Sequence, residues 1–353
     1  MVPYRNSNWG DMKTQGRIPT LDGLRAVAIL IVIVSHTDDH HGALAKLGHV
    51  GVMIFFALSG YLITSRLLDE FRKNGRISLR NFYLRRAFRI LPPAVTYLTV
   101  VTLLTALGVI VCNPSAIRAA LLFYINYIDG TGYVGHFWSL SVEEHFYLIW
   151  PCLLIWFGVL AGWRTAAALA IMILLWRLGD NHFHIISQIF NAPHLQQYNY
   201  RTDLIADTLL WGCCLAFVKV RLSAAVSTVG ALISSVLLVW MVLGIPGASP
   251  RIDYFIQNMH FLPALLLCAI VSCPDAPIGR LLDLAPMRFL GNLSYSLYIW
   301  QQLFLAGPGP KLPVAFGITA AFACAYLSYR FIEQPSIRLG KRVIAGRGLV
   351  SAA

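Results

Sequence analysis

The chain has 353 residues, of which 57% are hydrophobic and only 12% are charged, and its mean hydropathy is +0.64. Soluble globular domains carry about a quarter charged residues, so this composition excludes a soluble protein and predicts an integral membrane protein. The net charge of +12 does not indicate a nucleic-acid partner, because the basic residues flank apolar segments and do not form a stripe with interleaved aromatics.

Ten apolar segments recur along the chain, and such segments suit α-helices that cross about 30 Å of hydrocarbon. They lie near residues 21–37, 48–68, 91–112, 138–160, 163–178, 203–218, 224–244, 255–273, 287–307 and 313–332. No polar stretch between them is long enough for a separate soluble core. The sequence therefore predicts an all-α, polytopic membrane protein of one domain with about ten transmembrane helices.

Basic residues are distributed unevenly between the two sides of this predicted bundle. When the 28 Lys and Arg residues are assigned to alternate sides, 22 fall on one side and 6 on the other. Basic loops remain in the cytoplasm, so both termini are expected to be cytoplasmic. The predicted parts are a cytoplasmic N-terminal arm at 1–20, a transmembrane domain at 21–335 and a cytoplasmic basic tail at 336–353. A cleaved signal peptide is disfavoured, because ionisable residues follow the first apolar run at once.

The first apolar segment, LDGLRAVAILIVIVSHTDDHHG from Leu21 to Gly42, carries a cation near its start and an imidazole near its end. Arg25 and His36 are eleven residues apart, which on an α-helix places them within about 20° of one face and roughly 16 Å apart along the axis. Alone, Arg25 is compatible with a cytoplasmic anchor and His36 with an interfacial side chain. Together they predict a polar stripe that faces the bundle interior or a water-filled cavity.

The segment FYLRRAFRILPP at 82–93 is amphipathic, strongly basic and rich in aromatics, so we expect it at the cytoplasmic interface. Two interpretations stay open. It is an anchor for lipid headgroups, or Arg85, Arg86 and Arg89 form a clamp for phosphate groups, which guanidinium binds in a bidentate manner.

Two further segments place ionisable residues inside or beside apolar helices. In HFWSLSVEEHFYLIWP at 136–151, Glu143 shares a face with Ser139, while Glu144 points about 100° away. Carboxylates within a membrane cost roughly 2.5–3.5 kcal/mol at its centre and mark functional sites by default, although a structural ion pair is the alternative. In NYRTDLIADTLLWG at 199–212, Arg201 and Asp203 are expected to contact a hydroxyl-rich substrate or to form a loop ion pair.

These residues resemble the acyltransferase 3 family, bacterial integral-membrane enzymes that move acyl groups from coenzyme A thioesters to hydroxyls of sugars and related molecules. The resemblance runs from Leu21 to about Arg342. It rests on six stretches in the family's order: LDGLRAVAILIVIVSH, GVMIFFALSGYLI, YLRRAFRILP, WSLSVEEHFYLIWP, FLGNLSYSLYIWQ and FIEQPSIRLGKR.

The resemblance implies roles for five residues. Arg25 and His36 form the family's Arg-x10-His pair, with His36 as the catalytic histidine; Arg86 and Arg89 form the Arg-x-x-Arg pair that holds coenzyme A; Glu143 is the acid of the W-S-L-x-V-E segment. The sequence departs from the family twice. Many members have Asp where this chain has Met53 and His where it has Gln301, so neither position is assigned any chemistry.

We therefore expect an O-acyltransferase of the bacterial inner (plasma) membrane, in which an acyl-CoA, with acetyl-CoA the first candidate, binds to Arg25, Arg86 and Arg89 at the cytoplasmic face. His36 would take the proton of a sugar or glycan hydroxyl, with Glu143 orienting its imidazole, although a covalent acyl-histidine stays open. The partners are acyl-CoA, a sugar or glycan acceptor and membrane lipid, with no nucleic acid.

Near the opposite mouth, Asp38, Arg201 and Asp203 are the expected contacts of the acceptor. No metal is expected, because the seven cysteines show no paired C-x-x-C spacing. Since the chain ends soon after the last apolar segment, it is expected to act without the extracytoplasmic esterase-like domain that some relatives append. The alternative function is a secondary transporter or flippase for an acylated or sugar substrate, with Glu143 and His36 coupling to protons.

Overall fold

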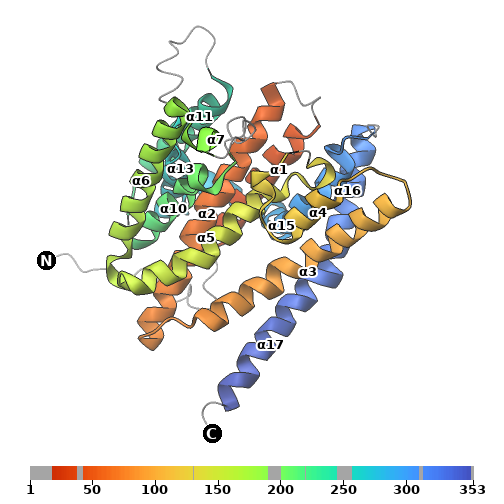
Figure 1. The fold of residues 1–353 in the computed structure, drawn as a ribbon. Helices are drawn as coiled ribbons and strands as arrows, with labels where there is room; N and C mark the ends of the chain where they lie inside the picture. The colour runs from red at the N-terminus through yellow and green to blue at the C-terminus, as the bar shows by residue number, and fades with distance from the viewer. Residues whose placement is uncertain are drawn as a thin grey trace, which may run out of the picture.

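The structure, a computed structural model, describes residues 18–37, 43–129, 131–189, 200–218, 220–244, 257–309 and 313–350. Within these ranges every regular element is helical, which confirms the all-α prediction (Figure 1). The longer helices are α1 (Pro19–Ser35), α2 (Ala43–Asn74), α3 (Leu79–Ala106), α5 (Phe137–Trp156), α6 (Gly162–Phe183), α10 (Asp207–Phe217), α11 (Ala224–Leu243), α13 (Leu262–Ser272), α15 (Ala285–Leu305), α16 (Val314–Ser328) and α17 (Gln334–Val350). The shorter elements are α4 (Pro114–Leu121), η2 (Ile125–Tyr127), η3 (Gly132–Val134), η4 (Val159–Ala161), α7 (Ile185–Ile189), α9 (Thr202–Ile205), α14 (Pro277–Leu282) and the π-helical turn η5 (Tyr329–Glu333).

The ten predicted apolar segments each contain a helix, but the helices differ in length. Among the described residues, five helices are long and apolar enough, by length and composition, to cross a membrane. They are Leu44–Asn74, Leu79–Ala106, Val159–Phe183, Ala224–Leu243 and Val314–Ala345. Helices α10 and α13 are apolar but shorter. The described part of the chain is thus a helical bundle with at least some helices of membrane-spanning length.

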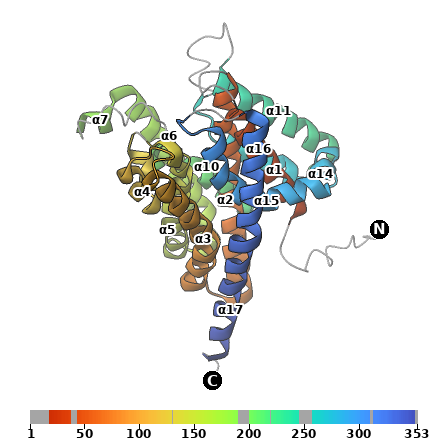
Figure 2. The ribbon, with the colours of Figure 1, turned by 90° about the vertical axis from the view of Figure 1, so that its right-hand side faces the viewer.

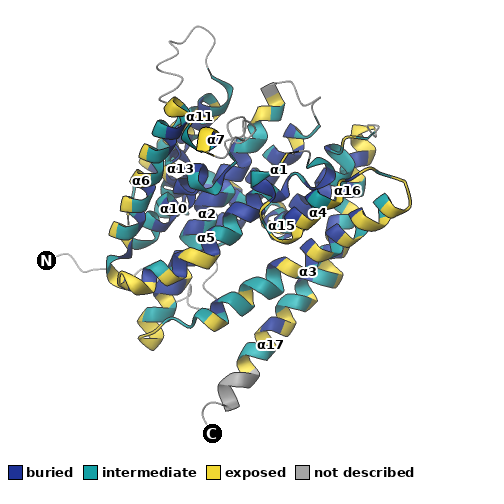
Figure 3. Cartoon of the chain, viewed as in Figure 1, coloured by how far each residue is buried: buried dark blue, intermediate teal, exposed yellow. Residues whose placement is uncertain are grey.

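Large apolar side chains cover much of the outside of the bundle. Trp156, Leu160 and Phe331 are 83%, 74% and 69% exposed, and exposed residues mark the outward faces of the outer helices in Figure 3. Contiguous apolar surface of this kind is rare on soluble monomers. Together with the long apolar helices, it indicates a membrane protein.

Helix α1 lies at the centre of the bundle and packs against α2 on one side and α15 on the other. Backbones approach closely at both contacts: an added Cβ at Gly51 would overlap the carbonyl oxygen of Ala28, and one at Gly291 would overlap that of Asp22. Small residues allow such close helix packing in membranes. The position of α1, and of its polar stripe, is therefore fixed from two sides.

Helices α3 and α17 pack against each other and project from the rest of the bundle (Figures 1 and 2). The basic segment 82–93, expected at the cytoplasmic interface, lies in the first part of the continuous helix α3. That helix starts where the Ser78 hydroxyl accepts a hydrogen bond from the backbone N–H of Asn81, and it continues through Pro92 and Pro93. The basic tail expected at 336–353 is likewise helical as far as Val350, since η5 joins α16 to α17 without a break.

Candidate active site

Two cavities lie along α1. One, the arginine cavity, has a volume of about 360 Å³ and is lined at its basic wall by Arg25, Arg66, Arg86, Arg89 and Lys341. The other, the histidine cavity, has a volume of about 620 Å³ and is lined by His36, His49, His136 and His260. Val52 and Tyr298 line both. The two cavities are therefore neighbours that share part of one wall.

The arginine cavity brings together the three arginines that the sequence predicted as a group. Arg25 comes from α1, whereas Arg86 and Arg89 come from α3 and are one turn apart. Arg85, which the clamp hypothesis grouped with Arg86 and Arg89, does not line the cavity and instead forms a 2.9 Å ion pair with Glu70 on the surface. A wall of converging guanidinium groups is suited to phosphate groups.

Arg66 of α2 and Lys341 of α17 complete this basic wall, and the sequence analysis missed both. Arg66 lies at the end of the apolar segment 48–68 and Lys341 lies in the predicted basic tail, so each was counted only as a cytoplasmic flank. The acids of the same cavity are Asp22, Glu143 and Glu333. Five basic groups against three acidic groups leave the cavity with an excess of positive charge.

Glu143 is connected to Arg86 through a chain of contacts across three helices. Its Oε1 accepts a hydrogen bond of 2.5 Å from the Ser59 hydroxyl of α2, and that hydroxyl accepts one of 3.0 Å from the Tyr147 hydroxyl of α5. The guanidinium of Arg86 lies 4.3 Å from the centroid of the Tyr147 ring, a cation–π contact. Glu143 therefore helps to fix the groups that position Arg86.

This arrangement differs from the expected pairing of Glu143 with His36. Glu143 lines the arginine cavity and His36 lines the histidine cavity. The reason lies in the direction of α5: Ser139 is near the shared wall, where its hydroxyl lies 2.6 Å from the Tyr298 hydroxyl, and Glu143 is one turn further into the arginine cavity. Its neighbour Glu144 has one buried carboxylate oxygen without a hydrogen-bond partner among the described residues.

Glu333 is a second buried carboxylate that the sequence analysis did not identify. It is 2% exposed and accepts a 2.7 Å hydrogen bond from the hydroxyl of Ser296 on α15. It ends the π-helical turn η5, and such turns frequently occur at functional sites. The available signal was the glutamate that directly follows the tenth apolar segment in FIEQP.

His36 caps the C-terminal end of α1, where its backbone N–H donates to carbonyls of the last turn. The helix is unbroken from Arg25 to this cap, so the predicted separation of roughly 16 Å along its axis applies. One helix therefore contributes a guanidinium to the arginine cavity and an imidazole to the histidine cavity.

An aromatic wall forms part of the histidine cavity. The rings of Trp138 and Tyr200 stack with centroids 4.3 Å apart, and the His49 ring lies 6.1 Å from Trp138. Polar groups of Asn126, Asp129 and Gln302 also line the cavity. No group of three or more His, Cys, Asp or Glu side chains within the described ranges could hold a metal ion.

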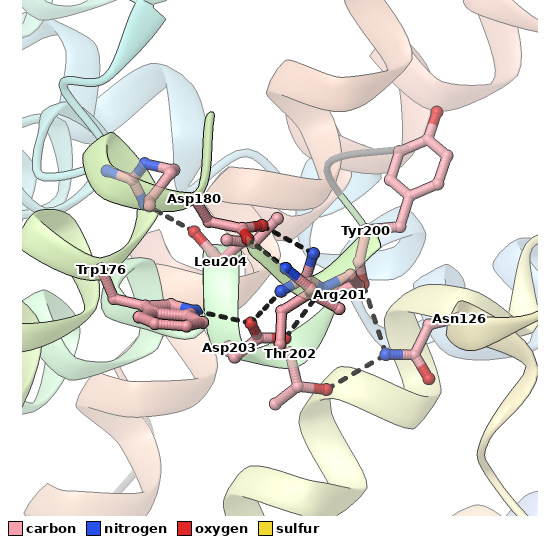
Figure 4. Close-up of polar contacts among 10 residues, drawn as sticks. Asn126, Trp176, Asp180, Tyr200, Arg201, Thr202, Asp203 and Leu204 are labelled. Atoms are coloured by element: carbon pink, nitrogen blue, oxygen red, sulfur yellow. Dashed lines mark hydrogen bonds and ion pairs between the residues drawn. The ribbon is translucent and has the colours of Figure 1, made fainter. Parts of the chain in front are cut away.

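Arg201 lines the same cavity and is held by two carboxylates, those of Asp180 at 2.7 Å and Asp203 (Figure 4). Asp203 also accepts a 2.8 Å hydrogen bond from the indole of Trp176. Figure 4 shows the Tyr200 ring pointing away from this cluster. The predicted acceptor contacts Arg201 and Asp203 thus lie together in one ion-pair cluster, in which Arg201 is buried and Asp203 is partly exposed. Asp38 falls outside the described residues.

A second buried cluster joins α6, α10 and the turn before α13. Arg177 forms a 2.9 Å ion pair with Asp207, and His260 lies 2.9 Å from the other oxygen of that carboxylate. The sequence alone did not predict this cluster. An arginine inside the apolar segment 163–178 was the available signal, because a buried cation requires a partner.

The fold and the two cavities define a helical membrane protein with a cationic chamber beside a chamber rich in imidazole and aromatic groups. Residues 18–330 match the family model described as "Acyltransferase domain". The chain therefore belongs to this acyltransferase family, whose members transfer acyl groups other than aminoacyl groups, as the resemblance had implied.

Curated relatives carry names of matching activity. The peptidoglycan O-acetyltransferase OatA of Listeria monocytogenes serovar 1/2a is 32% identical over 90% of this chain and 55% of its own length. The YrhL protein of Bacillus subtilis strain 168, provisionally named as a peptidoglycan O-acetyltransferase, is 32% identical over 94% of this chain and 56% of its own. The chain thus spans little more than half the length of these relatives. No solved structure matches the chain.

Proposed function

We propose that this chain is a membrane O-acyltransferase that transfers an acetyl group from acetyl-CoA to a hydroxyl of a glycan, with peptidoglycan the first candidate. The observation that carries the proposal is that α1 joins a cavity with five basic side chains to a cavity lined by His36. The names of the relatives, which refer to O-acetylation of peptidoglycan, support the choice of acyl group and acceptor.

The donor would bind in the arginine cavity. Its phosphates would contact Arg25, Arg86 and Arg89, joined by Arg66 and Lys341, and the excess of positive charge favours a polyanion. The thioester end of the donor would then point along α1 towards the shared wall at Val52 and Tyr298. The length of about 16 Å between Arg25 and His36 is comparable to that of a pantetheine arm.

The acceptor would bind in the histidine cavity, which is large enough for a sugar unit. Its aromatic wall offers flat apolar surface and its polar groups offer hydrogen bonds, the usual combination in a site that must orient a small molecule. Arg201 and Asp203 would support the wall by holding the segment that carries Tyr200.

His36 would exchange the proton at the reacting centre, and Glu143 would act through Ser59 and Tyr147 on the donor site. Proton transfer by a positioned imidazole typically contributes 10²–10⁴-fold to a rate.

The orientation belongs to the same proposal. The chain would cross the bacterial inner membrane about ten times with both termini cytoplasmic, so that the arginine cavity faces the pool of acetyl-CoA. The arm 1–20, the domain 21–335 and the tail 336–353 would have the boundaries predicted from sequence.

The test is to purify the chain in detergent, supply acetyl-CoA, and follow free thiol with and without chito-oligosaccharides or muropeptides. The proposal requires thiol release that depends on the acceptor and an acetylated glycan detected by mass spectrometry. A transporter would leave the thioester intact, so transport of a sugar into vesicles without thiol release would contradict the proposal.

A further inference from the structure

His260 lines the histidine cavity and is bonded on its other side to a buried ion pair. Its Nδ1 lies 2.9 Å from Oδ1 of Asp207 and 2.8 Å from Nη1 of Arg177. The side chains of Arg177 and Asp207 are 2% and 1% exposed, whereas that of His260 is 8% exposed and reaches the cavity. The imidazole thus connects the buried pair to the space where an acceptor would bind.

The number of protons on Nη1 of Arg177 indicates whether Nδ1 of His260 acts as a hydrogen-bond donor or acceptor. Nη1 of Arg177 carries two protons and has two partners that can only accept: the backbone carbonyl of Leu204 at 2.6 Å and Oδ2 of Asp207 at 2.9 Å. Nδ1 of His260 is therefore not required as an acceptor. If Nδ1 were unprotonated, its lone pair would face the lone pairs of Oδ1 of Asp207, which is unfavourable. We assign the proton to Nδ1 on this basis.

The rest of the Arg177 guanidinium is fixed as well. Nε donates to the side-chain oxygen of Asn258 at 3.0 Å, and Nη2 donates to the backbone carbonyl of the same residue at 3.1 Å. Because Asn258 lies two residues before His260, these bonds tie the turn that carries the imidazole to α6. The ring is thus held in place from both the backbone and Nδ1.

A neutral imidazole with its proton on Nδ1 has a lone pair on Nε2, which makes Nε2 a proton acceptor. A carboxylate that binds Nδ1–H holds the ring in this tautomer and stabilises the imidazolium once Nε2 accepts a proton. From this geometry we propose that His260, oriented by Asp207, is the general base that takes the proton of the acceptor hydroxyl. The inference rests on the proposed acyl transfer and divides its proton transfers between two histidines.

The step balances as follows. The acceptor oxygen forms the new C–O bond while its proton passes to Nε2 of His260. The C–S bond of the thioester breaks, and the sulfur leaves as a thiol after taking a proton from the imidazolium of His36. The proton on His260 then returns to His36 through water in the histidine cavity, which restores the neutral His260 and the protonated His36.

The first experiment uses His260→Ala in the full chain, with the exposed His182→Ala of α6 as the matched control. Asp207 is left intact, because removing one partner of a buried ion pair is strongly destabilising. We expect transfer to the glycan to fall about 10²–10⁴-fold in His260→Ala with unchanged binding of acetyl-CoA. Added imidazole should restore the rate at least about tenfold, which a purely structural histidine would not permit. His182→Ala should behave as the parent, with or without imidazole.

The second measurement does not require a folded variant. In the unsubstituted chain labelled with ¹⁵N-histidine, the His260 signals should show a protonated Nδ1 and a bare Nε2. A proton on Nε2 with a bare Nδ1 overturns the proposal, and so does a His260→Ala variant that transfers acetyl as fast as the control. If the unsubstituted chain releases no thiol from acetyl-CoA, the proposed function fails instead, and the NMR result still decides the tautomer.

Discussion

Arg25 and His36 lie on the same unbroken helix, eleven residues apart, and each lines a different cavity. The helix therefore sets a fixed distance between a guanidinium that can hold phosphate and an imidazole that can move a proton. In the proposed function this distance is comparable to the length of the donor's pantetheine arm. The acyl group would be transferred at the wall that the two cavities share.

The arginine pair of α3 provides the simplest test of the donor site. Replacing Arg86 and Arg89 with Ala should raise the dissociation constant for acetyl-CoA by about 10-fold or more, since a charge-assisted hydrogen bond contributes about 1.5–3 kcal/mol. Binding is measured by isothermal titration in detergent. Arg85→Ala, which removes only a surface ion pair, should change the affinity little. Equal affinity for acetyl-CoA in the double variant and in this control would contradict a donor-binding role and favour lipid anchoring by the segment 82–93.

Arg66 tests whether the structure adds a residue that the sequence did not single out as part of the donor site. Arg66→Ala should weaken acetyl-CoA binding by a factor of about 10, and Arg66→Lys should restore only part of the loss, because an ammonium cannot bind phosphate in a bidentate manner. The same titration measures both variants. Full affinity in Arg66→Ala would show that this side chain only balances the buried carboxylates.

Glu143 should act on the donor site and not on His36. Glu143→Gln disturbs the hydrogen bonds of Ser59 and Tyr147, so we expect a higher KM for acetyl-CoA with a smaller change in kcat. Because these contacts lead to Arg86, the double variant with Arg86→Ala should cost less than the two single effects combined. A loss confined to kcat, with the KM unchanged, would favour the original pairing with His36.

Trp138 tests the acceptor site independently of the donor. Trp138→Ala should raise the KM for a glycan acceptor about 10-fold, as expected when an aromatic wall is lost, while the KM for acetyl-CoA stays the same. Trp156→Ala, which removes an indole exposed on the outside of the bundle, is the matched control. Steady-state kinetics with each substrate varied in turn separate the effects. If only the KM for acetyl-CoA rose, the aromatic wall would belong to the donor site instead of the acceptor site.

Sequence patterns predicted those parts of the fold and site that depend on local periodicity. The helices followed from apolar segments, and the stripe of Arg25 and His36 followed from 3.6 residues per turn. The partners of Glu143 did not follow, because Ser59 is 84 residues away and its contact depends on how α2 and α5 pack. Helix packing depends on side chains from distant segments, so a single sequence indicates which residues are polar but not which of them meet.

The same limit explains the missing members of the site. In the sequence, Arg66 resembles any basic residue that flanks an apolar segment. The position of Glu333 depends on a π-helical turn that no residue pattern predicted. His260 follows a short turn, and its proposed role depends on contacts with Asp207 and Arg177, which are 53 and 83 residues away in the sequence. Intramembrane charges were recognisable from sequence as requiring partners, whereas the identity of those partners required the structure.

The most direct test of the whole account is acetyl transfer by His36→Ala, measured as free thiol and acetylated glycan in the same reaction. We predict a loss of about 10²–10⁴-fold in transfer, since proton exchange at the reacting centre is removed. Acetyl-CoA binding should be unchanged, because the arginine cavity is intact. Transfer close to that of the unsubstituted chain would contradict the assignment of His36 and with it the proposed path along α1.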